Sequence, residues 1–159
     1  MFELKIKDKQ SLKKIIIGLH SKGKRVVFTN GCFDILHYGH AKYLQQAKAK
    51  ADILVVAINS DASVRKLKGN DRPLVSQEFR AKMVAALSSV DYVVIFPEET
   101  PLEIIKFLKP DILVKGGDWQ EDKIVGADFV KSCGGKVYSI KFIPGFSTTN
   151  IIKKIVKTS

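Results

Sequence analysis

Short apolar runs alternate with helical patterns along the whole chain, and this alternation constrains the fold more than any other feature. Runs rich in β-branched and aromatic residues predict five strands, at 26–29, 53–58, 92–96, 111–114 and 136–140. Apolar residues at helical spacing, with turn or capping residues at the ends, predict helices at 11–20, 40–50, 61–67, 76–87, 101–108, 122–132 and 147–156. Strands and helices that alternate in this way are typical of the α/β class.

The run at 53–58 is continuously apolar, as expected for a strand that is covered on both faces. Right-handed crossovers between strands limit the possible topologies. We therefore predict an α/β fold with three layers, a Rossmann-like parallel five-stranded sheet with helices on both faces. The 159 residues suit one domain, 1–159, in which 1–23 form an N-terminal helical extension.

Unusual polar residues follow four of the predicted strands. They occupy 30–40, 59–61, 115–119 and 145–149. Ligands of open parallel sheets bind at the carboxyl ends of the strands, where the strand order reverses. The agreement of these four positions indicates a single site.

Segment 30–40 carries two of the chain's three histidines, His37 and His40, where a strand passes into a helix. Helix N-termini attract anions through free N–H groups and the helix dipole, so a phosphate site is the first hypothesis. Two histidines at this spacing also suggest metal ligands, but no carboxylate or third histidine completes a set nearby, and we expect no protein metal site. Neither a GxxxxGK[ST] loop nor a GxGxxG turn is present, which disfavours P-loop kinases and dinucleotide oxidoreductases.

The net charge of +11 is compatible with nucleic acid, a membrane surface or an anionic small substrate as the partner. The lysines are spread along the chain, which favours a solvated surface or attraction of phosphorylated substrates, and a basic nucleic-acid-binding module stays as a remote alternative. The two cysteines lie far apart without a CxxC pair, against a disulfide framework or thiolate zinc site. No run is long enough to span a membrane and no secretory signal is visible, so we expect a cytoplasmic protein.

Two motifs resemble the signatures of the nucleotidyltransferase superfamily. Residues 37–40, His-Tyr-Gly-His, match its HxGH signature, and 145–152 are similar to its second signature, a Ser/Thr-rich turn that opens a helix. The resemblance runs from 24 to 157. Within the superfamily it is closest to the nucleotidyltransferase domain of ADP-heptose synthases, in the segments 29–37, 59–63, 67–69, 72–73, 113–118 and 147–155. Glycerol-3-phosphate cytidylyltransferases carry an Arg-Thr-Glu-Gly run before the turn, whereas 142–145 here read Phe-Ile-Pro-Gly.

The resemblance implies an adenylyltransferase. Such an enzyme transfers AMP from ATP to D-glycero-β-D-manno-heptose 1-phosphate and releases ADP-heptose and pyrophosphate. The ADP-heptose is used for lipopolysaccharide core or related surface-glycan synthesis. It implies Mg²⁺ that binds with ATP, a homodimer, and a separate kinase that supplies the sugar 1-phosphate. A cytidylyltransferase acting on glycerol 3-phosphate, or another sugar-phosphate nucleotidyltransferase, stays open as the alternative.

The resemblance also implies a set of site residues. The catalytic candidates are His37, His40, Lys42 and Lys68. The nucleotide-binding candidates are Asn30, Gly31, Cys32, Phe33, Gly39, Asn59, Asp61, Lys115, Gly116, Asp118, Phe146, Ser147, Thr148 and Thr149. The sugar-phosphate candidates are Asp34, Arg72, Arg80 and Trp119.

Several of these residues also have a purely structural interpretation. Asp34 could only orient its turn, Arg80 could form a structural ion pair, and Lys42 could be a solvated helix residue. Trp119 could cap the core, and 147–149 could be a simple helix cap. For Cys32 we expect a small buried side chain rather than a nucleophile.

Overall fold

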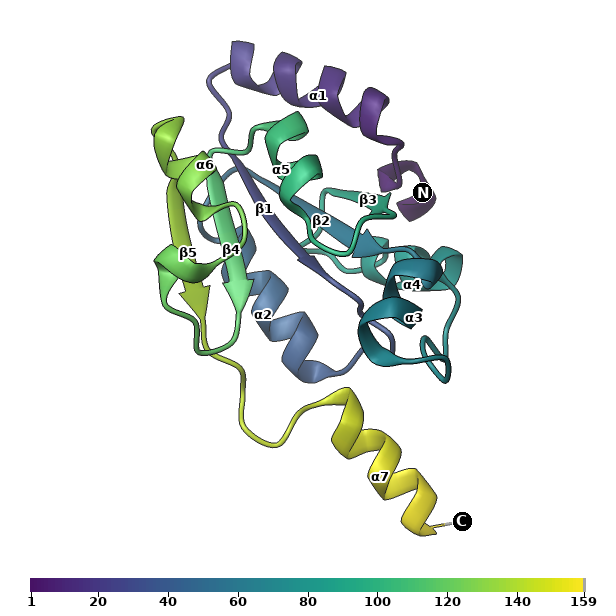
Figure 1. Cartoon of the computed structure of the whole chain (residues 1–159). Helices are drawn as coiled ribbons and strands as arrows, with labels where there is room; N and C mark the ends of the chain where they lie inside the picture. The colour runs from purple at the N-terminus through teal and green to yellow at the C-terminus, as the bar shows by residue number, and fades with distance from the viewer. Residues whose placement is uncertain (159) are drawn as a thin grey trace.

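The computed structural model describes residues 1–158 and places five strands in one parallel sheet (Figure 1). The strands are β1 (Val26–Gly31), β2 (Ile53–Asn59), β3 (Tyr92–Phe96), β4 (Ile112–Gly116) and β5 (Lys136–Ile140), in the spatial order β3-β2-β1-β4-β5. The strand order reverses between β1 and β4, and a crevice opens at the carboxyl ends of such a pair. The predicted fold class is confirmed.

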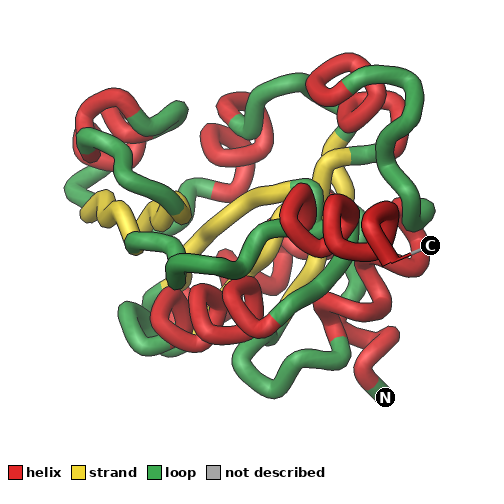
Figure 2. The backbone as a smooth tube through the Cα atoms, turned by 90° about the horizontal axis from the view of Figure 1, so that it is seen from below, coloured by secondary structure: helices red, strands yellow, loops and turns green. Residues whose placement is uncertain are grey.

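Helices cover both faces of the sheet (Figures 1 and 2). They are η1 (Phe2–Lys5), α1 (Lys9–Ser21), α2 (Tyr38–Lys48), α3 (Asp61–Lys68), α4 (Gln77–Ala85), α5 (Leu102–Leu108), η2 (Glu121–Lys123), α6 (Ala127–Ser132) and α7 (Thr148–Thr158). α1, α5 and α6 pack on one face, while α2 and α4 pack on the other. The expected N-terminal extension includes α1, which buries Leu12 and Ile16 in the first of these cores.

Successive residues of a strand point to opposite faces, and the two cores follow this alternation. In β1, Val26 and Phe28 lie in the core under α1 and α5, while Val27 lies in the core under α2. α7 lies beyond the carboxyl edge of the sheet and buries none of its residues (Figure 1). The two packed faces therefore hold the sheet, and the carboxyl edge is left for a site.

Two helices differ from the sequence prediction. The helix expected at 122–132 is interrupted by Gly126, whose φ of +88° belongs to the left-handed region, so that η2 and α6 are separate. In α4 the apolar residues at helical spacing are only partly buried, because Val84 is buried whereas Phe79 and Met83 are exposed, and Arg80 is buried on the same helix. The contacts of Arg80, described below, give the physical reason.

Candidate functional site

The turn between β1 and α2 is shaped by close contacts at two glycines. A Cβ on Gly31 would lie 2.8 Å from Cε2 of Phe33, so the Phe33 ring, which folds back over the strand end, would have to shift to admit a larger residue. A Cβ on Gly39 would lie 3.0 Å from Nδ1 of His37 and 3.1 Å from Cβ of Phe146. The small residue inside the HxGH motif therefore lets an imidazole and an aromatic ring approach the first turn of α2.

The two histidines of this motif stack on each other. Their ring centroids are 3.8 Å apart and the ring planes differ by 24°. Within residues 1–158, the buried Nδ1 atoms of both His37 and His40 have no hydrogen-bond partner. Buried polar atoms without partners are uncommon in native proteins, and a catalytic role or a bound group is a common explanation.

Burial, together with smaller electrostatic effects of His37 and Lys68, lowers the pKa of His40 to about 4. Burial also lowers the pKa of His37. Both imidazoles are therefore neutral at pH 7 and each carries one N–H donor. A stacked pair of neutral donors at a helix start suits the oxygen atoms of a phosphate chain.

Two adjoining cavities open at the carboxyl edge of the sheet. The histidine hollow, about 290 Å³, is lined by Asn30, Gly31, Cys32, Phe33, Asp34, His40, Tyr43, Lys68, Lys115, Gly116, Trp119, Phe142 and Thr148. The α5 hollow, about 410 Å³, is lined by Asn30, Gly31, Cys32, Asn59, Leu67, Lys68, Glu99, Thr100, Pro101, Lys115, Trp119, Lys123, Ile124 and Val125. The end of β1 thus lies between two cavities that share Lys68, Lys115 and Trp119.

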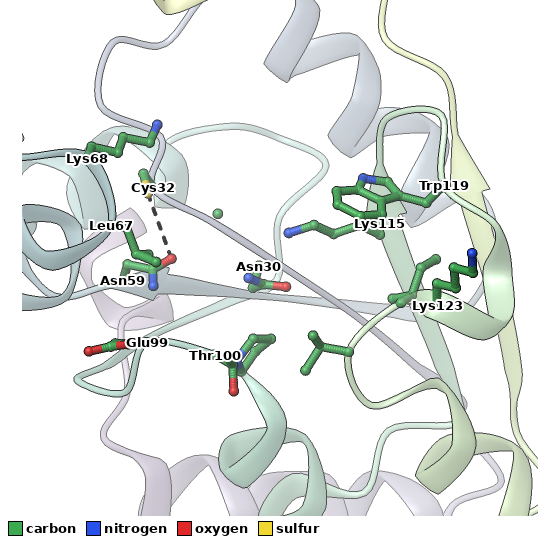
Figure 3. A pocket seen from close by; sticks show the side chains of 14 residues that line it. Asn30, Cys32, Asn59, Leu67, Lys68, Glu99, Thr100, Lys115, Trp119 and Lys123 are labelled. Carbon is green, nitrogen blue, oxygen red and sulfur yellow. Dashed lines mark hydrogen bonds between the residues drawn. The ribbon is translucent and has the colours of Figure 1, made fainter.

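A row of three polar side chains lies along the α5 hollow, where Asn59, Asn30 and Lys115 come from the adjacent strands β2, β1 and β4 (Figure 3). Along its strand, each of the three lies two residues after a residue of the core under α5. Its side chain therefore points to the same face of the sheet as that core. The Lys115 amine points into the hollow (Figure 3), and burial lowers its pKa. Asn59 is held by a 2.9 Å hydrogen bond that its Nδ2 donates to Ser63.

Trp119 is fixed over the glycine turn that follows β4. Its indole Nε1 donates to the carbonyl of Gly116 at 3.1 Å, and its backbone N–H donates to the Ser139 hydroxyl at 3.2 Å. The same hydroxyl donates to the carbonyl of Gly117 at 2.6 Å. These bonds place the indole at the boundary of both hollows rather than in the core.

The C-terminal Ser/Thr turn lies beside the start of α2, as the two motifs together predicted. Phe146 packs edge-on against Tyr38 at 5.4 Å and lies parallel to His37 at 6.4 Å, measured between ring centroids. The Thr148 hydroxyl donates to the carbonyl of Ile35 at 3.5 Å and lines the histidine hollow. The Ser147 hydroxyl instead caps α7 by accepting from the backbone N–H of Asn150 at 3.0 Å.

Arg80 corrects one sugar-phosphate prediction. Its side chain is fully buried, with Nη2 donating to Asp61 and to the carbonyl of Asn59, both at 2.8 Å. Nε donates to the carbonyl of Val75 at 2.9 Å, and Nη1 donates to the carbonyl of Cys32. The guanidinium thus ties the ends of β1 and β2 to α3 and the loop before α4, and cannot reach a substrate. Asp61, predicted to bind nucleotide, is the other half of this ion pair.

Asp34 and Arg72 also form a structural pair. Asp34 accepts from Nη1 of Arg72 at 3.0 Å and from the backbone N–H groups of Leu74 and Val75. Although burial raises the pKa of this carboxyl, the hydrogen bonds and the Arg72 charge hold it below its usual value. Arg72 lies outside both hollows, and the Asp34 carboxylate, which lines the histidine hollow, orients the loop at 72–75.

Lys42 is the third correction. Its amine donates to Oε1 of Gln45 at 3.2 Å, and it lines a separate surface depression with Tyr38 and Leu87. Ten predicted residues line neither hollow: His37, Gly39, Lys42, Asp61, Arg72, Arg80, Asp118, Phe146, Ser147 and Thr149. Of these, His37, Gly39 and Phe146 contact each other and support the site.

The sequence prediction missed part of the cavity lining. In the histidine hollow the unexpected lining residues are Tyr43 and Phe142. In the α5 hollow they are Leu67, Glu99, Thr100, Pro101, Lys123, Ile124 and Val125. Glu99 and Thr100 follow β3, so the rule that placed ligands after strand ends could have found them. Thr100 directly precedes the predicted helix at 101–108 but does not cap it, because the N-cap of α5 is Pro101 and no side-chain cap bond forms.

Residues 1–158 contain neither a candidate metal cluster nor a candidate membrane-spanning helix. No group of three or more His, Cys, Asp or Glu side chains within residues 1–158 could hold a metal ion. Mg²⁺ commonly binds through substrate phosphates and water with few protein ligands, so a magnesium ion that arrives with a phosphorylated substrate needs no such cluster. None of the helices described is long and apolar enough to cross a membrane.

Comparison with known proteins places this geometry in a family. The model of the cytidylyltransferase-like family matches residues 28–154. The proteins named bifunctional protein HldE from Syntrophotalea carbinolica and Geobacter sulfurreducens are 54% and 55% identical over 155 residues, which are 98% of this chain and 32% of each relative. The chain thus spans about a third of the length of these relatives.

A solved structure is also similar. The lipopolysaccharide core biosynthesis protein from Thermoplasma volcanium has 29% sequence identity and a TM-score of 0.60, covering 76% of this chain and 98% of its own. The two HxGH histidines, His37 and His40, and the Ser/Thr turn all fall within the region that the family model matches.

Proposed function

The chain belongs to the cytidylyltransferase-like family and is a nucleotidyltransferase, and from this premise we propose that it transfers AMP from ATP to D-glycero-β-D-manno-heptose 1-phosphate. The single observation that carries the nucleotide site is the stacked pair of neutral histidines, with unpartnered Nδ1 atoms, at the start of α2. The similarity to HldE proteins over nearly the whole chain supports the choice of a heptose phosphate. The similarity to the lipopolysaccharide core biosynthesis protein from Thermoplasma volcanium supports a product used for lipopolysaccharide core synthesis.

In the proposed reaction, a phosphate oxygen of the sugar 1-phosphate attacks the α-phosphorus of ATP. A new P–O bond forms there while the bond from the α-phosphorus to the bridging oxygen breaks, and pyrophosphate leaves in line. No covalent enzyme intermediate is needed, so catalysis consists of positioning and charge stabilisation. We assign the N–H donors of His37 and His40, with the Thr148 hydroxyl, to the oxygens of the triphosphate.

Lys68 is the lysine best placed for the developing charge. It lines both hollows and lies close enough to His40 to lower the pKa of that imidazole. An ammonium at this boundary can reach a phosphate oxygen on either substrate. Bound Mg²⁺ would neutralise the β- and γ-phosphates and the leaving pyrophosphate.

The proposal is tested by a panel of nucleotides and acceptors. Pyrophosphate release is measured with ATP, CTP or GTP against heptose 1-phosphate, glucose 1-phosphate and glycerol 3-phosphate. We expect the highest kcat/KM for ATP with heptose 1-phosphate. No turnover with any sugar 1-phosphate would sink the proposal, and a strong preference for CTP with glycerol 3-phosphate would favour the alternative enzyme.

Three further expectations depend on this function. ATP and sugar phosphates are cytoplasmic metabolites, so the proposed reaction takes place in the cytoplasm. The homodimer stays a prediction, which analytical ultracentrifugation measures directly. The nucleic-acid-binding alternative predicts salt-sensitive binding to DNA or RNA, and its absence near physiological salt, with ATP bound, eliminates it.

A further inference from the structure

The helix α7 carries an exposed apolar face. It follows the segment 141–147 and projects away from the sheet (Figure 1). Its four aliphatic residues lie at helical spacing and share one side of the helix: Ile151, Ile152, Ile155 and Val156. Ile155 and Val156 are 57% and 69% exposed, and α7 buries none of its residues. An exposed aliphatic face of this kind marks a surface that meets another molecule.

The polar side of α7 is purely basic. Lys153, Lys154 and Lys157 lie opposite the aliphatic residues and are exposed. Among the described residues, their ammonium groups form no hydrogen bond or ion pair. The wider segment 129–159 contains six lysines and no Asp or Glu, so its side chains contribute +6 to the net charge of +11. The end of the sequence is therefore both amphipathic and strongly cationic.

This combination narrows the choice of partner. A second copy that paired its α7 with this one would bring two sets of three lysines together, and their repulsion opposes association. Nucleic acid would neutralise the lysines but would leave the aliphatic face in water. An anionic lipid surface offers phosphate groups to the lysines and hydrocarbon to the aliphatic side chains. A helix with one basic and one aliphatic side is typical of helices that lie in the plane of a membrane interface.

The length of α7 also suits a position in the interface. Its 11 residues give a helix of about 16 Å at 1.5 Å per residue. The hydrocarbon core of a bilayer is about 30 Å thick, so α7 can lie along the surface but cannot cross it. Lysine side chains are long enough to keep their ammonium groups among the phosphates while the helix rests on the hydrocarbon.

We propose that α7 is an interfacial anchor for the surface of an anionic phospholipid bilayer. Its aliphatic side chains enter the hydrocarbon below the phosphate groups, and its three lysines bind those groups. Thr148, at the start of α7, lines the histidine hollow, so bound protein holds that hollow close to the membrane surface. The inference goes beyond the proposed function and does not rest on it, because lipid binding needs neither ATP nor a sugar phosphate.

Co-sedimentation with vesicles tests the proposal. The full chain is mixed, without nucleotide, with vesicles of phosphatidylcholine alone or of equal parts phosphatidylcholine and phosphatidylglycerol. We expect the affinity for the anionic vesicles to be about tenfold higher or more, and to fall steeply as salt is added.

Two variants test the two sides of α7 separately. The double variant Ile155→Asn, Val156→Asn changes the most exposed part of the aliphatic face. It should weaken binding to the anionic vesicles by about tenfold or more. The triple variant Lys153→Gln, Lys154→Gln, Lys157→Gln should weaken it by about tenfold or more and remove most of its dependence on salt.

A matched control removes the same charge from another part of the molecule. Lys14, Lys22 and Lys136 are exposed and lie on α1, at its end and at the start of β5, away from α7 (Figure 1). Replacing all three by Gln should change the affinity for anionic vesicles by less than about threefold. Thermal unfolding of each variant verifies that the fold is intact.

The proposal is overturned if the wild-type protein binds neither kind of vesicle, or if the double variant binds as the wild type does. It is equally overturned if the control weakens binding as much as the triple lysine variant, because net charge alone would then explain the binding. Two further measurements identify a different partner. Analytical ultracentrifugation would show a dimer that the double variant dissociates if the face joins two copies. Salt-sensitive binding of single-stranded DNA that the triple variant removes, without vesicle binding, would assign α7 to nucleic acid.

Discussion

At the scale of single residues, the site depends on groups whose partners are missing rather than on groups that are already paired. His37, His40 and Lys115 have buried or half-buried polar atoms without partners among the described residues. Asp34 and Arg80 are equally polar but fully engaged with the protein. A polar side chain available to a substrate is one that the fold has left unsatisfied.

His40→Ala should abolish most of the turnover without unfolding the protein. The imidazole contributes an N–H donor to the phosphate chain, and removal of one such donor costs about 10²–10³ in kcat. Pyrophosphate release measures the effect, and circular dichroism verifies the fold. His20→Ala is the matched control, because His20 lies at the end of α1 and pairs with Asp111 at 2.9 Å. Near-normal activity of His40→Ala would contradict the assigned role.

The same residue predicts how stability depends on pH. The pKa of His40 is about 4 in the folded protein, below its ordinary value of 6.5, so the folded state binds fewer protons between these values. Stability should therefore fall as the pH drops from 6.5 to about 4 and stop responding to this group below that. Urea unfolding at a series of pH values should show a shallower fall for His40→Gln. Parallel curves for the two proteins would refute the prediction.

At the scale of elements, the loops after the strands are positioned by side chains whose bonds and contacts are made within the protein. Arg80 on α4 bonds to carbonyls at the ends of β1 and β2, and Asp34 holds the loop at 72–75. Phe146 packs against His37 and so brings the start of α7 to the start of α2. These bonds and contacts tie the elements around the two hollows to one another.

Arg80→Lys should destabilise the protein by about 3–5 kcal/mol, as expected when a buried ion pair is broken. One ammonium cannot replace bonds that Nε, Nη1 and Nη2 send to Val75, Cys32, Asn59 and Asp61. Urea denaturation at pH 7 measures the loss. Unchanged stability together with a raised KM for the sugar phosphate would restore the substrate-binding role.

At the scale of the whole molecule, the packed sheet and the C-terminal arm have separate tasks. The two cores are built by α1, α2, α4, α5 and α6, whereas α7 buries none of its residues. The arm contributes the Thr148 hydroxyl and a helix start to the histidine hollow. The buried cores therefore lie outside the arm, which instead supplies part of the lining of the histidine hollow.

A chain that ends at residue 146 should stay folded and lose much of its nucleotide affinity. Because α7 has no buried residues, the free energy of unfolding should change by less than about 1 kcal/mol. The affinity for α,β-methylene-ATP, measured by calorimetry, should fall about tenfold or more, since the helix start and the Thr148 hydroxyl are removed. Loss of the folded state would show that the arm also supports the core.

The sequence alone determined the five strands, most helix positions and the HxGH turn, because hydrophobic periodicity and turn chemistry act between residues close in the chain. It also placed His40, Thr148 and Lys115 at one edge of the sheet. Only the tertiary structure decided which polar groups are free, since Arg80 and Lys42 look equally available in the sequence. Whether each side chain is available depends on the carbonyls and side chains that packing brings near it. The separation of the two hollows by the end of β1 is likewise a result of packing.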